Sequence, residues 1–281
     1  MNPSPADRDW AEREYNPRLS VPDAPAIYEA WPARAEATRG RCPPLALRYG
    51  EHPRETLDLF RAADPRGTVL FIHGGYWRAF SKDSFSWVAD GFLGQGLSVA
   101  LLNYPLCPDV SLAHIAASTR RAFAHLHREA LSEAERRAIV ATGHSAGGYL
   151  AALHLATAWE EHGLPDDPLL GAVPISGVFS LVPLLATSMN EAIGLDLPQA
   201  DALSLTDKPW RSRARLALVV GGEESAEFHR QSADLAAGWS DLDPALIDLP
   251  GRNHFDVIDG LGEPGSPLNR TIMEMFDPAR G

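Results

Sequence analysis

From about residue 45 onward, short apolar runs alternate with longer amphipathic segments. Residues 45–50 and 55–62 alternate apolar and polar positions, as half-buried antiparallel strands do. Later runs are continuously apolar and end in glycine or proline, which is typical of buried parallel strands. These runs are GTVLFIHGG (67–75), SVALLNYP (98–105), RRAIVATGHSAGG (136–148), LLGAVPISG (169–177), RLALVVGG (215–222) and PALIDLPG (244–251).

Helical segments are predicted between these runs, at residues 84–96, 111–130, 147–163 and 226–239. Strands that alternate with helices predict an α/β fold, with a mostly parallel central sheet flanked by helices and antiparallel edge strands first. The Pro- and Arg-rich residues 1–44 are expected to form an extended or loosely helical arm packed on a main domain of residues 45–281. Residues 181–212 break the rhythm and predict a small cap over the carboxyl edge of the sheet, where α/β proteins bind ligands.

Composition narrows the function classes. The chain has 281 residues and a formal net charge of −12, which argues against a nucleic-acid partner because such binders need a basic surface. Cys42 and Cys107 form no CxxC motif, and no H-x-x-E-H or clustered His/Asp spacing appears, so we expect no metal and no cofactor. The polar N-terminus and the lack of a long apolar run predict a cytoplasmic protein without a membrane partner. A homodimer is left open.

The stretch GHSAGG places Gly143, Ser145 and Gly147 in G-x-S-x-G spacing, between an apolar strand and a helix. A sharp strand-to-helix turn needs small neighbours and exposes the serine hydroxyl beside the positive end of the helix. The alternative is an ordinary glycine-rich turn, but the strand and helix on either side favour a nucleophilic Ser145. We therefore predict nucleophilic catalysis.

A serine at its free pKa is a poor nucleophile and needs a base. His144 adjoins the serine, and its side chain is expected to point away. His154 and His229 lie in predicted helices and are expected to be structural. His254 lies in the loop after the last apolar run, and the order serine, acid, histidine is that of a known triad class. His254 is the predicted base, with a solvated loop histidine as the alternative.

The triad acid should follow the run 215–222, where Glu223 and Glu224 stand. Two adjacent residues in extended backbone point to opposite sides, so only one is expected to face His254. It would hold the imidazole tautomer and stabilise the imidazolium. The residues alone do not separate the two glutamates, and Asp207 and Asp256 are lesser candidates.

The combination of HGGYW, GHSAGG, EFHRQS and NHF, with the early EYNPR, resembles the α/β-hydrolase superfamily and, within it, the serine-dependent kynurenine formamidases (arylformamidases) and related HGGxW esterases. The resemblance covers nearly the whole chain. The family places its triad acid, an aspartate, at the position of Glu224, so the resemblance favours Glu224 over Glu223. Glutamate there is a departure from the family pattern, and Arg78 is a second one. Arg78 is expected to be a surface residue, with pairing to a substrate carboxylate as the alternative.

The double glycine in FIHGGYWRAF fits an oxyanion site, since a tetrahedral intermediate needs preorganised N–H donors. The expected donors are Gly74, Gly75, Tyr76 and Ala146. His73 is expected to brace this loop rather than act as a base.

The resemblance implies hydrolysis of N-formyl-L-kynurenine, a small-molecule substrate, to kynurenine and formate through a formyl-enzyme. Tyr76 and Trp77 would close the acyl side, with the aryl amine under the cap near Phe179 and Met189. Packing of Trp77 in the core is the other interpretation. The alternatives in function are a carboxylesterase or an amidase or carbamate hydrolase acting on another small ester or anilide, and a binding module with Ser145 unused.

Overall fold

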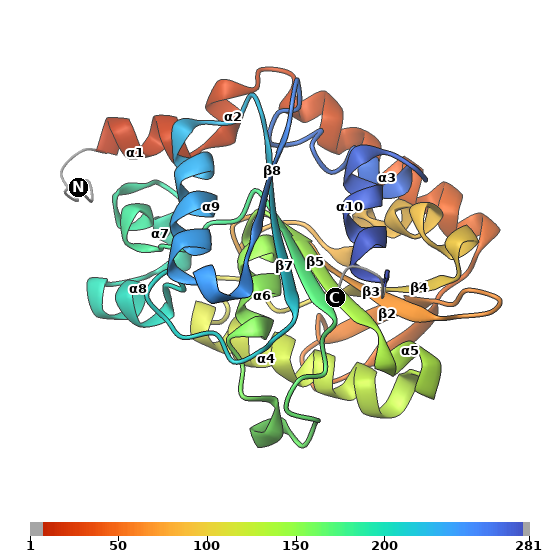
Figure 1. Ribbon diagram of the computed structural model, residues 1–281. Helices are drawn as coiled ribbons and strands as arrows, with labels where there is room; N and C mark the ends of the chain where they lie inside the picture. Colours follow the sequence, from red (N-terminus) through yellow and green to blue (C-terminus); the bar gives the residue numbers. More distant parts are fainter. Residues whose placement is uncertain (1–7, 278–281) are drawn as a thin grey trace.

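The computed structural model describes residues 8–277, so the first seven residues of the predicted arm and the last four of the main domain lie outside the described residues. Its centre is an eight-stranded sheet in the order β1-β2-β4-β3-β5-β6-β7-β8 (Figure 1). The strands are β1 (Leu45–Arg48), β2 (Thr56–Phe60), β3 (Gly67–Ile72), β4 (Leu97–Leu102), β5 (Ile139–His144), β6 (Gly171–Ile175), β7 (Arg215–Gly221) and β8 (Ala245–Leu249).

Strand direction follows the hydrophobic pattern. The alternating segments β1 and β2 pair antiparallel, and β2 pairs antiparallel with β4. The continuously apolar strands pair parallel from β4 through β8. Strands β3, β4 and β5 are buried at every position, because helices cover both faces of the sheet there. The predicted α/β fold with antiparallel edge strands first is confirmed.

Two apolar layers hold the helices on the sheet. One contains residues of α4, α6 and α9, and the other contains residues of α3 and α10 (Figure 1). The helices are α1 (Arg8–Tyr15), α2 (Pro17–Ser20), α3 (Ala24–Arg41), α4 (Leu112–His125), α5 (Glu133–Arg137), α6 (Ala146–Leu155), α7 (Asn190–Ile193), α8 (Leu197–Leu203), α9 (Ala226–Gly238) and α10 (Pro267–Met275).

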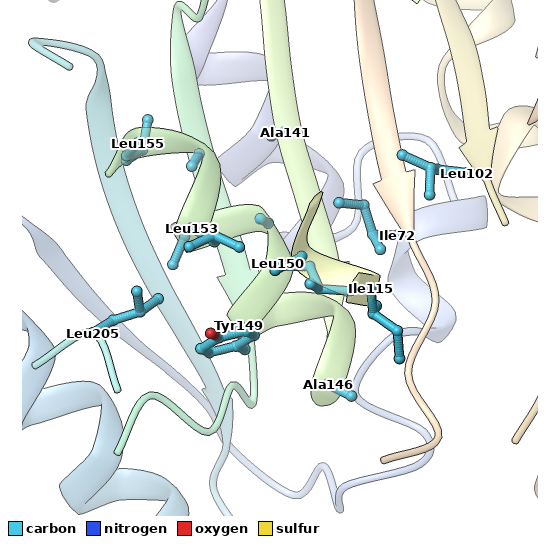
Figure 2. Packing of buried hydrophobic residues seen from close by; sticks show 14 of the residues in the cluster. Ile72, Leu102, Ile115, Ala141, Ala146, Tyr149, Leu150, Leu153, Leu155 and Leu205 are labelled. Carbon is cyan, nitrogen blue, oxygen red and sulfur yellow. The ribbon is translucent and has the colours of Figure 1, made fainter. Parts of the chain in front are cut away.

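Helix α6 is buried along its whole length, which fixes the residue that precedes it. Figure 2 shows Leu150 and neighbouring side chains of α6 lying among Ile72 of β3, Ile115 of α4 and Leu205. Each fully buried leucine of this kind stabilises the fold by about 1.5–3 kcal/mol. The turn between β5 and α6 is therefore anchored on a rigid core.

The N-terminal residues are helical. Helix α3 continues through Pro32 and buries Trp31 and Ala35 against the 3-10 helix Ser86–Gly91. That 3-10 helix belongs to the predicted helical segment 84–96, which forms two short 3-10 helices instead of an α-helix. The glycine at position 91 permits close packing of this segment, because a Cβ there would lie 1.9 Å from the Leu261 carbonyl oxygen.

Residues 181–212 contain a 3-10 helix, Val182–Ala186, followed by α7 and α8. Figure 1 shows α7 and α8 on the same side of the molecule as α9 and α1. Within residues 8–277, no helix is both long enough and apolar enough to cross a membrane.

Candidate active site

Ser145 occupies the sharp turn between β5 and α6. Its backbone has φ 55° and ψ −119°, a region that is costly for a residue with a side chain. Its N–H donates to the Ile175 carbonyl oxygen at 2.8 Å. A Cβ at Gly147 would lie 2.0 Å from the Ile72 carbonyl oxygen, and a Cβ at Gly143 would lie 2.2 Å from that of Gly147. The two glycines thus let the strands and helix close around a strained serine.

His254 and Glu224 form a buried pair. The Nδ1 of His254 lies 2.5 Å from Glu224 Oε2, and the two side chains are 4% and 0% exposed. The other carboxylate oxygen of Glu224 accepts from Ser176 Oγ at 2.5 Å and from the Gly221 N–H at 2.8 Å. A carboxylate held in this way favours the tautomer with the proton on Nδ1, which leaves Nε2 free to accept a proton from Ser145.

The other acidic candidates lie elsewhere. Glu223 and Asp207 are exposed to solvent. Asp256 accepts the Asn253 N–H at 2.7 Å and so stabilises its own loop. The structure therefore brings Glu224, and not the other three carboxylates, to His254. Ser176, which orients Glu224 from the end of β6, was missed in the sequence.

His144 also faces the site. The sequence predicts that its side chain points away from Ser145, but it lines the same cavity as Ser145 and His254. Its Nε2 donates to the His254 carbonyl oxygen at 2.7 Å, and the two imidazole rings lie 4.7 Å apart. Burial, with a smaller effect of the neighbouring His254, holds the pKa of His144 well below its usual value. A neutral His144 therefore anchors the loop that carries His254.

The loop after β3 packs directly on the serine. A Cβ at Gly74 would lie 2.7 Å from the His144 carbonyl oxygen and 3.2 Å from Ser145 Cβ. Gly75 has φ 105° and Tyr76 has φ 47°, so the chain turns sharply there. Among the described residues, the N–H groups of Gly75 and Tyr76 have no hydrogen-bond acceptor. The Ala146 N–H is free as well, since it begins α6.

His73 braces this loop from below. Its Nδ1 donates to the Gly74 carbonyl oxygen at 2.8 Å, and its Nε2 lies 3.2 Å from the side-chain oxygen of Asn103. The ring stacks on Tyr104 at 4.3 Å. Burial lowers the pKa of His73 to about 4, so the ring is neutral at physiological pH.

A cavity of about 360 Å³ opens over Ser145 and His254, near the lower end of the range of roughly 300–1,000 Å³ for ligand pockets. Aromatic side chains of Trp31, Phe80, Phe85 and Phe255 form part of its wall. Trp31 lies 5.0 Å from Phe85 and 5.5 Å from Phe80, measured between ring centroids. Within residues 8–277, no group of three or more His, Cys, Asp and Glu side chains is arranged to hold a metal ion.

Comparison with known proteins places this site in a family. A solved structure from Silicibacter sp. TM1040, described as a "putative thioesterase", is 35% identical to this chain. The two structures match over 88% of this chain and 93% of the Silicibacter chain, with a TM-score of 0.79. The chain belongs to the α/β-hydrolase superfamily. The family model BD-FAE matches residues 57–168.

This hydrolase is also similar to curated kynurenine formamidases. That of Salmo salar is 25% identical over 98% of this chain and 97% of its own length. Esterase B of Lactobacillus rhamnosis, 20% identical with a TM-score of 0.66, shares the fold over 90% of this chain and 93% of its own. The resemblance read from the sequence motifs is therefore confirmed.

Two residues expected to contact the substrate lie outside the cavity of the hydrolase. Trp77 is fully buried, with its ring 5.4 Å from Tyr149 in an edge-on contact. Phe179 is also fully buried, and its ring covers Gly177, where a Cβ would lie 2.3 Å from it. Neither residue lines the cavity, whereas Met189 does. Of the two interpretations of Trp77, this packing agrees with the core one.

The motif EFHRQS of the hydrolase holds the N-terminal helices in place. The Tyr15 hydroxyl donates to Glu227 at 2.5 Å and accepts from Gln231 at 3.0 Å. The Tyr76 hydroxyl donates to the Tyr15 carbonyl oxygen, so this network reaches the loop beside Ser145. Phe228 of the same motif packs 4.5 Å from the His254 ring. These contacts join segments far apart in sequence, and sequence analysis missed them.

Proposed function

We propose that this hydrolase cleaves aryl formamides, with N-formyl-L-kynurenine as the best candidate substrate. One observation carries the proposal. Ser145 and His254 open onto a small cavity with an aromatic wall, and Glu224 stands behind His254. An aromatic wall suits an aryl leaving group, because aromatic pairs gain energy beyond simple burial. Similarity to proteins named kynurenine formamidase over nearly the full chain supports the same substrate.

In the proposed reaction, Ser145 Oγ attacks the formyl carbon and passes its proton to His254 Nε2. The oxyanion then accepts hydrogen bonds from the loop Gly74–Tyr76 and from the Ala146 N–H. The C–N bond breaks as His254 gives the proton to the departing aryl amine. Water, deprotonated by His254, attacks the formyl-serine, and His254 returns the proton to Ser145 Oγ as the ester C–O bond breaks and formate leaves. Glu224 holds the His254 tautomer and stabilises the imidazolium throughout.

The substrate assay tests this proposal. Purified protein is assayed on N-formyl-L-kynurenine and on p-nitrophenyl acetate, and the two kcat/KM values are compared. We expect formamide turnover that is abolished in Ser145→Ala. Negligible formamide turnover with rapid ester turnover would favour a carboxylesterase instead, which the similarity to esterase and thioesterase structures makes the second candidate. Absence of turnover together with absence of labelling by a fluorophosphonate would favour a binding module.

A further inference from the structure

Two positively charged side chains line the cavity over Ser145. Arg18 and Arg78 line it, and among the described residues no aspartate or glutamate does. This stands against the whole chain, whose formal net charge is −12. A concave site with one sign of charge on low-dielectric walls concentrates ligands of the opposite sign.

Arg78 is free to bind a ligand. It is exposed and follows closely on the loop that packs against Ser145. Within residues 8–277, its guanidinium makes no hydrogen bond and no ion pair, although against the raising effect of burial its charge helps hydrogen bonds from Ser188 and Asn16 to lower the pKa of Glu12 on helix α1. The Glu12 carboxylate accepts from Asn16 Nδ2 at 3.1 Å and from the Ser188 N–H, and it does not line the cavity. The planar donor fork of Arg78 thus remains unused, and such a fork matches a carboxylate.

Arg18 holds its charge against the aromatic part of the cavity. Its guanidinium carbon lies 5.4 Å from the centroid of the Tyr28 ring, within cation–π range. The Tyr28 ring in turn lies 5.9 Å from Phe80 and 5.9 Å from Phe255, and both of these line the cavity. The two arginines therefore line the same cavity as the aromatic wall. Arg18 comes from the N-terminal segment, and Arg78 comes from the loop after β3.

We infer that Arg18 and Arg78 form an anion subsite, and that the substrate is an aromatic formamide or ester bearing a carboxylate away from the scissile bond. This inference rests on the proposed function, since it assumes that Ser145 is the reacting group of the same cavity. It restricts the substrate class, because a neutral anilide or aryl ester would leave both guanidinium groups unpaired. Arg78 and Arg18 then act in specificity rather than in bond breaking.

A matched pair of ligands tests the subsite. N-formyl-L-kynurenine and its α-carboxamide differ in the charge of one group. A hydrogen-bonded ion pair corresponds to a factor of about 10–100 in kcat/KM, which we expect in favour of the carboxylate. Arg78→Gln should reduce this ratio about tenfold through KM, because the interaction exists before the transition state. Arg78→Lys should restore part of the ratio, since it keeps the charge but not the fork. Arg18→Gln should also reduce it.

Arg13→Gln is the matched control, because Arg13 is an exposed arginine of α1 that does not line the cavity. The same ligands are titrated calorimetrically into Ser145→Ala, so that binding is measured without turnover. Equal dissociation constants for carboxylate and carboxamide, or a preference that Arg78→Gln and Arg18→Gln both leave intact, would overturn the anion subsite. Turnover of N-formyl-L-kynurenine by the parent protein would then leave the proposed function standing without the subsite, whereas no turnover of either the formamide or p-nitrophenyl acetate by the parent protein would overturn both.

Discussion

His154 is a titratable group that the proposed chemistry does not use. It lies on α6, fully buried, with its ring 5.4 Å from Phe123 and 5.3 Å from Trp159. Among the described residues, neither ring nitrogen has a hydrogen-bond partner of ordinary geometry. Burial and the positive charge of Arg120 lower its pKa from 6.5 to about 3, against a smaller raising effect of the Thr119 backbone.

The sign of the resulting pH dependence follows from proton linkage. Below a pH near 6.5 the unfolded chain binds a proton at His154 that the folded chain does not, so acid destabilises the fold. The stability from this residue is complete above the unfolded pKa and decreases as the pH falls toward the folded pKa of about 3. With these two pKa values, lowering the pH from about 7.5 to about 5 costs about 2 kcal/mol.

The perturbation is His154→Leu, which replaces the imidazole by an apolar side chain of similar bulk. Urea unfolding is measured for both proteins at about pH 7.5 and about pH 5, and the loss of unfolding free energy between the two is compared. We expect the variant to lose about 2 kcal/mol less than the parent. The exposed His114 of α4 provides the control His114→Leu. If the His154 variant and the parent lost the same unfolding free energy on acidification, the reasoning would be refuted.

Three further predictions concern catalysis. Ser145→Ala should lower kcat by about 10⁴–10⁶-fold, and retention of more than about a hundredth of it, in steady-state assays, would reject Ser145 as the nucleophile. Glu224→Gln should lower kcat by about 10⁴-fold, because a neutral amide does not stabilise the imidazolium of His254. Glu223→Gln, at an exposed position, should leave kcat unchanged, and the reverse result would reassign the acid. Gly74→Ala should lower kcat by about 10²–10³-fold with a smaller effect on KM, since its Cβ would displace the loop from the His144 carbonyl oxygen. A change in KM alone would contradict an oxyanion role.

The sheet and the serine could be predicted because their signals are local. Buried parallel strands require continuous apolar runs, and each such run became a strand of the sheet. The turn at Ser145 requires glycine on either side, because both Gly143 and Gly147 approach carbonyl oxygens too closely for a side chain. Each of these requirements is imposed within a few residues of the position it affects, so it is visible in the sequence.

The structural feature that separates Glu223 from Glu224 is not local in the sequence. The prediction treats the two residues as extended backbone, but they lie in a turn after β7, where the Glu224 N–H donates to the Gly221 carbonyl oxygen at 3.0 Å. The turn directs Glu224 inward to Ser176, at the end of a different strand. Only the family resemblance favoured Glu224, because Ser176 and the turn are determined by the packing of β6 beside β7.

The walls of the cavity were predicted least well, for a reason visible at Tyr76 and Trp77. Two aromatics beside the double glycine suggest an acyl-site wall, as long as the chain runs on in an ordinary conformation. Both residues have positive φ, 47° and 54°, yet Tyr76 lines the cavity, whereas Trp77 is buried in the core against Tyr149. Other parts of the aromatic wall come from distant segments, including Trp31 of α3 and Phe255 after β8. Such a wall requires the N-terminal helices to be docked, so the hydrogen bond that Tyr15 donates to Glu227 and the one it accepts from Gln231 shape the substrate cavity without touching it.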